Sequence, residues 1–300
     1  MAQTPKWMLL ALLFLTTSGL AQKQIQIPGP RSAYDISHDY HVSLLKLALE
    51  AGAKGRPVPP IRASLDMVEG RALRELAKGK WLDLYWLGTD VSKEQQLHAI
   101  KIPTTRGLIG FRKFLIHRDS TERLEQVESL AQLRSLVACQ GNDWADTQIL
   151  RQAGLKVTTT PSYESLFDML QARRCDYFPR GYHDHKKELQ LRAQHYPELI
   201  SYDGILLHYP FAVYFFTNND NHELAHWIET GLEKLIDSGR FLSFMQQHPL
   251  TAHIFPLNEQ PSTHYFRIDN PLLPQQTNYN NPRYWFRPQD FGLHETDKNN

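Results

Sequence analysis

The sequence has little of what marks most specialised classes of protein. Its 300 residues include only two cysteines, and 33 Lys and Arg are balanced by 32 Asp and Glu. Two cysteines exclude a disulfide-dense scaffold and a zinc-ribbon type of site. The net charge of +1 excludes the strongly basic surface that nucleic-acid binding requires. With 41% hydrophobic residues the chain can still form a core, so global disorder is excluded.

Long hydrophobic runs are absent beyond the first residues. In the segment 1–21, Lys6 precedes an apolar run from Trp7 to Leu15, and Gly19 and Ala21 supply the small residues of a cleavage site. This order is typical of a secretory signal peptide. A membrane anchor, the alternative, needs about 20 apolar residues, and this run ends after nine. We therefore expect a cleaved signal over 1–21 and a soluble, periplasmic, monomeric protein.

Motifs for enzymatic chemistry are also lacking. There is no Gly-x-Ser-x-Gly, no glycine-rich phosphate loop and no His-Glu-x-x-His in the sequence. His183, His185 and Glu188 invite a metal interpretation, but a polar helix start capped by Asp184 explains them better. We predict no enzyme activity, no metal site and no cofactor.

What the sequence does contain is about 200 residues of alternating strand-like and helix-like segments. Such alternation indicates an α/β fold with mainly parallel sheets. The expected strands are 24–27, 61–65, 81–86, 107–116, 135–139, 157–159, 176–178 and 210–216; the expected helices are 41–51, 68–77, 124–133, 144–153, 163–173, 185–195, 223–237 and 241–247. Pro179 is expected to end the strand 176–178 because proline has no N–H for a ladder bond.

Two further features remain open or irregular. Cys139 and Cys175 fall in expected strands of an exported protein, so either a disulfide or two buried free thiols is compatible with the sequence. From about residue 249, seven prolines and eight aromatic residues punctuate an Asn- and Gln-rich stretch. We expect this tail to be neither helix nor good strand, to wrap over the domain, and to fray over 295–300.

Several segments resemble a known family. The stretch Leu136-Val-Ala-Cys-Gln-Gly141, followed by Ile149–Gly154, Tyr163–Leu170 and Arg174–Tyr177, is similar to the second lobe of periplasmic type 2 solute-binding proteins, and in particular of the extracellular amino-acid-binding protein family 3. The segment from Gly88 through Thr89 to Gln96 occupies the place of that family's ligand-binding Thr-x-Glu-Arg. Other segments (106–112, 141–144, 175–181 and 270–274) resemble a divergent bacterial subgroup of undefined ligand.

The resemblance implies two α/β lobes with a ligand held between them and closed by hinge motion. The implied arrangement is a signal at 1–21, a first lobe at 22–111 and 209–248, a second lobe inserted at 112–208, and the tail at 249–300.

The sequence departs from the family where an amino acid would be clamped. Gln95 or Gln96 stands in place of the arginine that holds an α-carboxylate, and an amide cannot replace a guanidinium fork. Arg180 or Gly181 stands in place of the Asp that holds an α-ammonium. Arg180, with Arg106 or Arg112, would present positive charge instead, so we hypothesise a polar ligand that carries an anionic group. A plain surface arginine is the alternative interpretation of Arg180.

The remaining candidates lie at strand ends and a helix start. Asn142 and Asp143 open the helix that starts at Trp144, whose free N–H groups could receive an anion, although Asp143 as the helix N-cap is the simpler interpretation. Trp86 and Trp144 are candidate cleft aromatics, with core packing as the alternative. The predicted ligand-binding residues are Trp86, Thr89, Gln96, Arg106, Arg112, Asn142, Trp144 and Arg180.

The sequence thus favours a binding protein that delivers a small ligand to the permease of an ABC transporter, with no nucleic-acid partner. The first alternative is an accessory module that reports a ligand to a membrane sensor. The second is a dehydratase-like enzyme on the same fold, which would need an acid–base pair, for which Glu164, Asp176 and His183 are the candidates.

Overall fold

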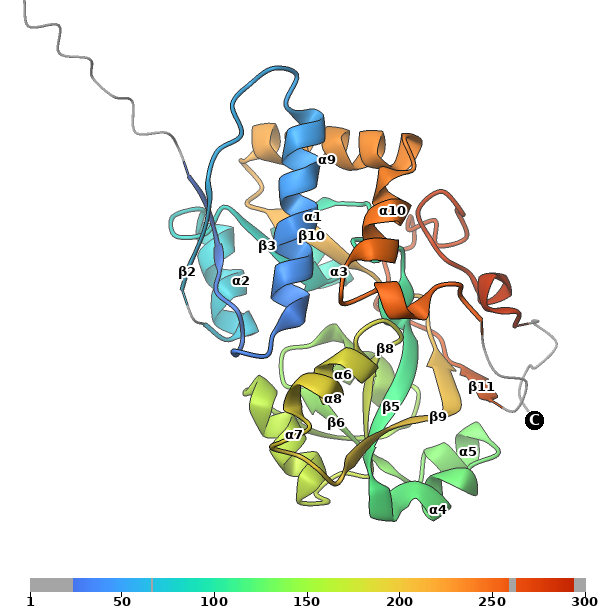
Figure 1. Cartoon of the computed structure of the whole chain (residues 1–300). Helices are drawn as coiled ribbons and strands as arrows, with labels where there is room; N and C mark the ends of the chain where they lie inside the picture. The colour runs from blue at the N-terminus through green and yellow to red at the C-terminus, as the bar shows by residue number, and fades with distance from the viewer. Residues whose placement is uncertain (1–23, 66, 259–262, 294–300) are drawn as a thin grey trace, which may run out of the picture.

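The computed structural model describes residues 24–65, 67–258 and 263–293. The expected signal peptide and the expected frayed end lie outside these residues. The described chain forms two α/β lobes, one above the other in Figure 1. No helix within the described ranges is long and apolar enough to cross a membrane.

The first lobe combines two small sheets with five α-helices. Its elements are β1 (Ile25–Pro28), α1 (Ile36–Gly52), β2 (Ile61–Leu65), α2 (Glu69–Lys78), β3 (Leu84–Gly88), α3 (Val91–Gln96), β4 (His98–Ile100), β10 (Val213–Thr217), α9 (His222–Asp237) and α10 (Arg240–Gln247). The strands β1 and β2 pair in parallel, and β10 lies antiparallel between β3 and β4.

The second lobe is built on one six-stranded sheet of order β11-β9-β5-β8-β6-β7. Its elements are β5 (Phe111–His117), α4 (Thr121–Glu125), α5 (Leu130–Leu133), β6 (Val137–Gly141), α6 (Ala145–Gln152), β7 (Lys156–Thr160), α7 (Tyr163–Gln171), β8 (Tyr177–Gly181), α8 (His185–Arg192), β9 (Leu199–His208) and β11 (His264–Arg267). Three neighbouring pairs are parallel, and β5 is antiparallel to both β8 and β9. The sheet is therefore mixed.

The strands β5 and β9 connect the lobes. The chain enters the second lobe along β5 and leaves it along β9, and the two strands pair antiparallel from Phe111 opposite His208 to His117 opposite Leu199. At the crossing, Tyr209 N donates to Gly110 O at 3.1 Å. Because both connections run side by side in one sheet, the lobes face each other across a narrow junction.

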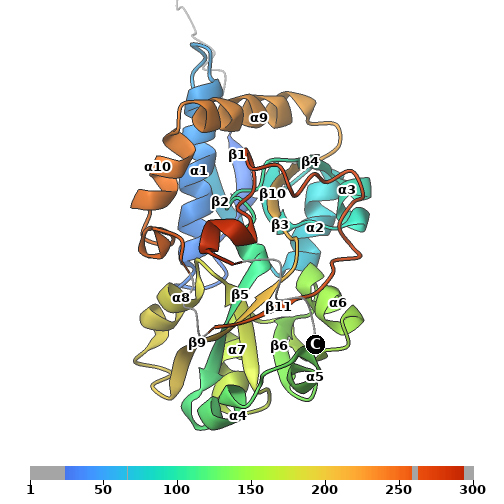
Figure 2. The same cartoon turned by 90° about the vertical axis from the view of Figure 1, so that its right-hand side faces the viewer.

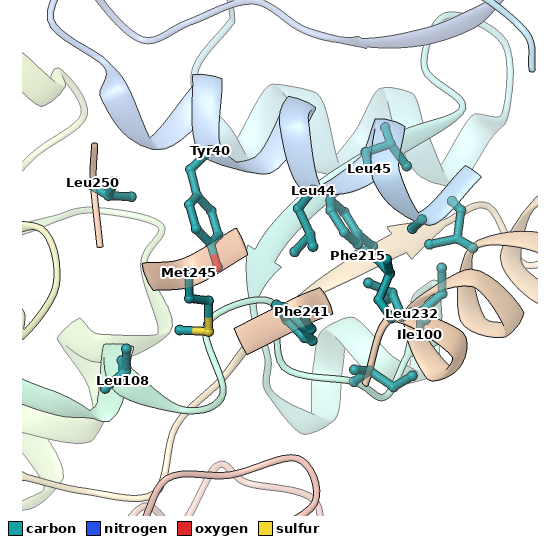
Figure 3. Close-up of a cluster of buried hydrophobic side chains, with 14 of the residues drawn as sticks. Tyr40, Leu44, Leu45, Ile100, Leu108, Phe215, Leu232, Phe241, Met245 and Leu250 are labelled. Carbon is teal, nitrogen blue, oxygen red and sulfur yellow. The ribbon is translucent and has the colours of Figure 1, made fainter. Parts of the chain in front are cut away.

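The core of the first lobe lies between α1 and the helices α9 and α10. Figure 3 shows Tyr40, Leu44 and Leu45 of α1 pointing toward side chains of β10, α9 and α10. The helices α1 and α9 approach closely because Gly231 has no side chain: a Cβ there would overlap the carbonyl oxygen of Ala48. This packing holds α1 rigidly beside the cleft.

Four local expectations are corrected by the structure. The expected helix 124–133 is two short helices, α4 and α5, because the segment between them turns. β8 does not end before Pro179 but continues to Gly181. β6 pairs with β8 only at Tyr177, so at Pro179 there is no hydrogen bond to β6 that the missing N–H could break. The long strand β9 was not expected. Residues 107–110 form a 3₁₀ turn (Leu108–Gly110) and not the start of a strand.

The tail does wrap over the domain, as expected, but it also contains a strand. β11 adds to the second-lobe sheet beside β9, and Figure 2 shows the chain then passing up along the first lobe. There Arg283 forms ion pairs with Glu233 and Asp237 of α9 at 2.5 and 2.7 Å. The tail is thus attached to both lobes.

Cys139 and Cys175 form a disulfide, with their Cα atoms 5.6 Å apart. The bond joins β6 to the residues that lead into β8, within the core of the second lobe. Of the two alternatives that the sequence left open, the structure has the bonded one.

Candidate functional site

A cavity of about 330 Å³ lies between the lobes. Its walls come from the β1–α1 and β2–α2 segments and β3 of the first lobe, from β6, α6, the start of α7 and β8 of the second, and from both crossing segments. The lining residues that carry the argument are Arg31, Glu69, Trp86, Thr105, Arg112, Asn142, Asp143, Trp144, Asp146, Arg180, His183 and Asp184. Groups distant in the sequence are brought together here by the closure of one lobe on the other.

Five of the eight predicted residues line this cavity: Trp86, Arg112, Asn142, Trp144 and Arg180. The Trp86 ring stacks on His41, with centroids 5.0 Å apart and planes 2° from parallel. The Trp144 ring lies against Gly141, where a Cβ would collide with it. Both indoles therefore pack on the protein with one side while contributing to the cavity wall.

The other three predicted residues lie elsewhere. Thr89 is buried at the end of β3, where its hydroxyl donates to Glu94 at 2.6 Å. Gln96 is exposed on α3 and donates to the Ser92 hydroxyl of its own helix at 3.0 Å. Arg106 faces the tail: its Nη2 donates to Pro282 O at 2.6 Å. These three do not line the cavity, and their side chains make local capping, helix or tail contacts instead.

Arg180 is buried and already neutralised. Its Nε and Nη2 donate to the two carboxylate oxygens of Glu188 at 2.6 and 2.8 Å, and Nη2 lies 3.3 Å from Asp184 Oδ2. Burial opposes ionisation of the guanidinium, but these two carboxylates outweigh it and raise the pKa of Arg180. Arg180 is therefore not a surface arginine, and its charge is balanced within the second lobe.

Arg112 is balanced in the same way. Its Nη2 pairs with the Asp146 carboxylate, which also accepts a hydrogen bond from the Tyr209 hydroxyl. Because a paired guanidinium attracts an anion far less than a free one, Arg112 and Arg180 offer less attraction to an anionic ligand than their positions in the sequence indicated.

Arg31, a third cleft arginine, was missed by the sequence analysis. Its Nε and Nη2 donate to Asp35 at 2.8 and 2.7 Å, and its guanidinium carbon lies 4.0 Å from the centre of the Tyr163 ring. Since Arg31 belongs to the first lobe and Tyr163 to the second, this contact spans the cleft. Its position just after the Gly29-Pro30 turn at the end of β1 is the one sequence signal that could have indicated it.

Glu69 is the second missed residue. It is the first residue of α2, and its side chain is 19% exposed. The nearest cation, Lys93 Nζ, is 4.0 Å away and is itself held by Asp90 at 2.6 Å. Burial raises the pKa of Glu69 to about 7, and the carboxylates of Asp143 and Asp146 add to the rise.

Asp143 differs from its expected role as a helix cap. The helix α6 begins after Trp144, and the Asp143 carboxylate lies against the first turn of α2 in the other lobe. A Cβ built on Gly70 would come within 2.8 Å of Asp143 Oδ2. The acidic side chains Glu69 and Asp143 thus meet across the cleft.

Four buried polar atoms in the cavity wall have no hydrogen-bond partner among the residues that the structure describes. They are Thr105 Oγ1, Arg112 Nε, His183 Nδ1 and Asp184 Oδ1. Each belongs to a residue at most 3% exposed. Buried polar groups without partners cost free energy, so such a cluster indicates a polar guest or ordered water. Burial lowers the pKa of His183 well below its usual value, so its ring is neutral there.

The candidate acid–base residues do not assemble in the cavity. Glu164 pairs with Arg192 at 2.6 Å, and Asp176 pairs with Arg123 at 2.5 Å. Only His183 of the three lines the cavity. Within the described chain no three His, Cys, Asp or Glu side chains gather as a metal site.

Comparison with solved structures shows what this architecture is. One similar solved structure is a histidine kinase sensor domain described as similar to periplasmic binding proteins. It is 16% identical to this chain, the match covers 76% of this chain and 96% of that domain, and the TM-score is 0.55. The amino acid ABC transporter substrate-binding protein AbpA from Streptococcus pneumoniae, bound to L-arginine, is 13% identical, with 75% and 94% covered and a TM-score of 0.56.

A periplasmic His/Glu/Gln/Arg/opine family-binding protein from Silicibacter pomeroyi, in complex with lysine, is 9% identical, covers 75% of this chain and 95% of its own, and has a TM-score of 0.55. No protein-family model matches the sequence, and no curated protein does. At these identities the likeness concerns the fold. The chain therefore has the two-lobed type 2 fold of periplasmic solute-binding proteins, as the resemblance implied.

Proposed function

We propose that this protein is an exported binding protein that holds a small polar molecule between its lobes. The observation that carries the proposal is the interlobe cavity, whose wall contains four buried polar atoms that find no partner in the described parts of the chain. A wall made by both lobes is what a hinged binding protein needs, because the guest then stabilises the closed form. The similar solved structures include binding proteins with arginine or lysine bound, which supports this use of the cleft.

Two partners are compatible with this function. Delivery to a membrane transporter is favoured by the likeness to a transporter substrate-binding protein. Reporting a ligand to a membrane sensor is the second candidate, and it is favoured by the likeness to a histidine kinase sensor domain, 96% of which is covered. The genes beside this one discriminate between them: a permease and an ATPase indicate transport, and a sensor kinase indicates signalling.

Native mass spectrometry of the protein purified without denaturation tests the binding function itself. We expect a fraction of molecules to carry a bound small molecule that is lost on unfolding and refolding. The refolded protein should then be stabilised against heat by that molecule. Bare protein that no amino acid, amine, carboxylate or sugar stabilises would reject the binding function.

A further inference from the structure

The charges around the cleft are unequal. Among the described lining residues, Arg31, Arg112 and Arg180 supply three positive charges, and Glu69, Asp143, Asp146 and Asp184 supply four carboxyl groups. Behind the wall, Asp35 and Glu188 add two more carboxylates, which pair with Arg31 and Arg180. The cleft therefore contains more acid than base.

Pairing each arginine with its nearest carboxylate shows where the excess lies. Arg31 forms an ion pair with Asp35, Arg112 with Asp146 and Arg180 with Glu188. Three carboxyl groups remain after this pairing: Glu69 in the first lobe, and Asp143 and Asp184 in the second.

Two of the remaining carboxyl groups, Glu69 and Asp184, are poorly compensated, whereas Asp143 is exposed. Lys93, the cation closest to Glu69, is shared with Asp90 at a shorter distance. Asp184 shares Arg180 with the closer Glu188, and its Oδ1 is one of the buried atoms without a partner among the described residues. This buried acceptor in the cavity wall points to a donor that the guest would supply.

We infer that the ligand of this cleft carries a cationic nitrogen that pairs with the excess carboxyl groups of the wall, Glu69 from one lobe and Asp143 and Asp184 from the other, and that it lacks a carboxylate. The inference rests on the proposed function and specifies the ligand class for the same site. A cationic guest would neutralise acidic groups that both lobes contribute, and so favour closure. A carboxylate would need the two-pronged donor of a free guanidinium, and each of the three lining arginines already pairs with a carboxylate, which leaves only Arg112 Nε as a buried nitrogen without a partner among the described residues.

Binding of such a ligand should depend on pH. The charged groups that face Glu69 are Lys93 from α3, Arg31 from the β1–α1 segment, and Asp143 and Asp146 from the second lobe. With a pKa of about 7, Glu69 of the empty cleft is partly protonated at neutral pH. Burial raises the pKa of Asp184 as well. A cation lowers both pKa values and expels protons, so affinity should rise from pH 6 to pH 8, by at most tenfold per unit for each released proton.

Pairs of probes that differ only in the α-carboxylate test the inference. Agmatine is compared with L-arginine, and cadaverine with L-lysine, by isothermal titration calorimetry at pH 7 in two buffers of different ionisation enthalpy. We expect each decarboxylated probe to bind at least tenfold more tightly than its amino acid, with net proton release. Tighter binding of arginine or lysine would overturn the inference and leave the proposed function standing.

Variants locate the contact. Glu69→Gln should weaken binding of the amine at least tenfold and reduce its pH dependence, because the carboxylate is lost while the shape is kept. Asp143→Asn, at an exposed position, should weaken it in the same direction. Glu75→Gln is the matched control, because Glu75 lies on the same helix and pairs with the exposed Lys78. Equal affinities for Glu69→Gln and Glu75→Gln would reject the role of Glu69.

Native mass spectrometry covers the case in which none of the four probes binds. A retained ligand that is an amine or guanidine would support the inference, whereas a retained acid, sugar or zwitterion would overturn it. A protein that retains nothing and binds nothing refutes the inference together with the proposed function, which distinguishes this outcome from the failure of the ligand class alone.

Discussion

Loss of the Cys139–Cys175 disulfide should destabilise the second lobe by about 4 kcal/mol. The bond links residues 36 positions apart and encloses α6, β7 and α7. A cross-link removes conformational entropy from the unfolded chain, and for a loop of this length the chain-entropy relation gives about 4 kcal/mol at 25 °C. This is a large fraction of the 5–15 kcal/mol that holds a typical domain folded, on the order of a third.

Urea unfolding measures this contribution. The variant C139A/C175A should have a free energy of unfolding about 4 kcal/mol below that of the oxidised protein, with a further loss of up to about 1 kcal/mol from the missing sulfur packing. Dithiothreitol provides the internal control. It should destabilise the wild-type protein by the disulfide contribution of about 4 kcal/mol and leave the variant unchanged. A wild-type protein that loses less than about 1 kcal/mol when mass spectrometry shows both thiols reduced would refute the reasoning.

Three further predictions concern other parts of the molecule. Gly231→Ala should cost about 3 kcal/mol or more in urea unfolding, because the new Cβ overlaps the carbonyl of Ala48 and forces α1 from α9; an unchanged midpoint would contradict this packing. Arg283→Gln should accelerate amide exchange in the tail around residues 276–286 and leave the midpoint of global unfolding nearly unchanged, since its ion pairs with Glu233 and Asp237 are exposed to solvent; unchanged exchange would show that these pairs do not hold the tail. Burial lowers the pKa of His208 to about 3, whereas in the unfolded chain it is near 6.5. Between these two values the unfolded chain binds a proton that the folded protein does not, so stability falls as the pH is lowered, by up to about 1.4 kcal/mol per unit until about pH 3. Unfolding at pH 7 and pH 5 should show a smaller loss for His208→Asn than for the wild type, and equal losses would contradict this assignment.

Residue patterns predicted most of the helices and strands, because each of these elements is indicated by the order of residues within its own short segment. The strand expected at 61–65 is β2, and the helix expected at 223–237 is α9 extended by one residue. β9 escaped prediction because Ser201, Asp203 and Gly204 interrupt its apolar residues, and only its pairing with β5 and β11 makes it a strand. β11 was missed for the same reason, since four residues of a proline-rich tail become a strand only beside β9.

The site was predicted in part. Residue type and position at strand ends indicated Trp86, Asn142 and Trp144, which line the cavity. Glu69 and Arg31 escaped because an acid in the first turn of a helix and an arginine after a turn look like ordinary surface residues in a sequence. Nothing local shows that the opposite lobe covers them.

Arg180 separates what the sequence determined from what only the tertiary structure decided. The expectation of export, the α/β class, the two lobes and a strand-end arginine all follow from residue patterns within short windows or from the resemblance. The charge that the cleft offers does not, because it depends on which carboxylates reach each guanidinium. Glu188 comes to Arg180 from the next helix, and Asp143 comes to α2 from the other lobe. Electrostatic interactions act through space, so their balance in a cleft is decided only when the lobes fold and close.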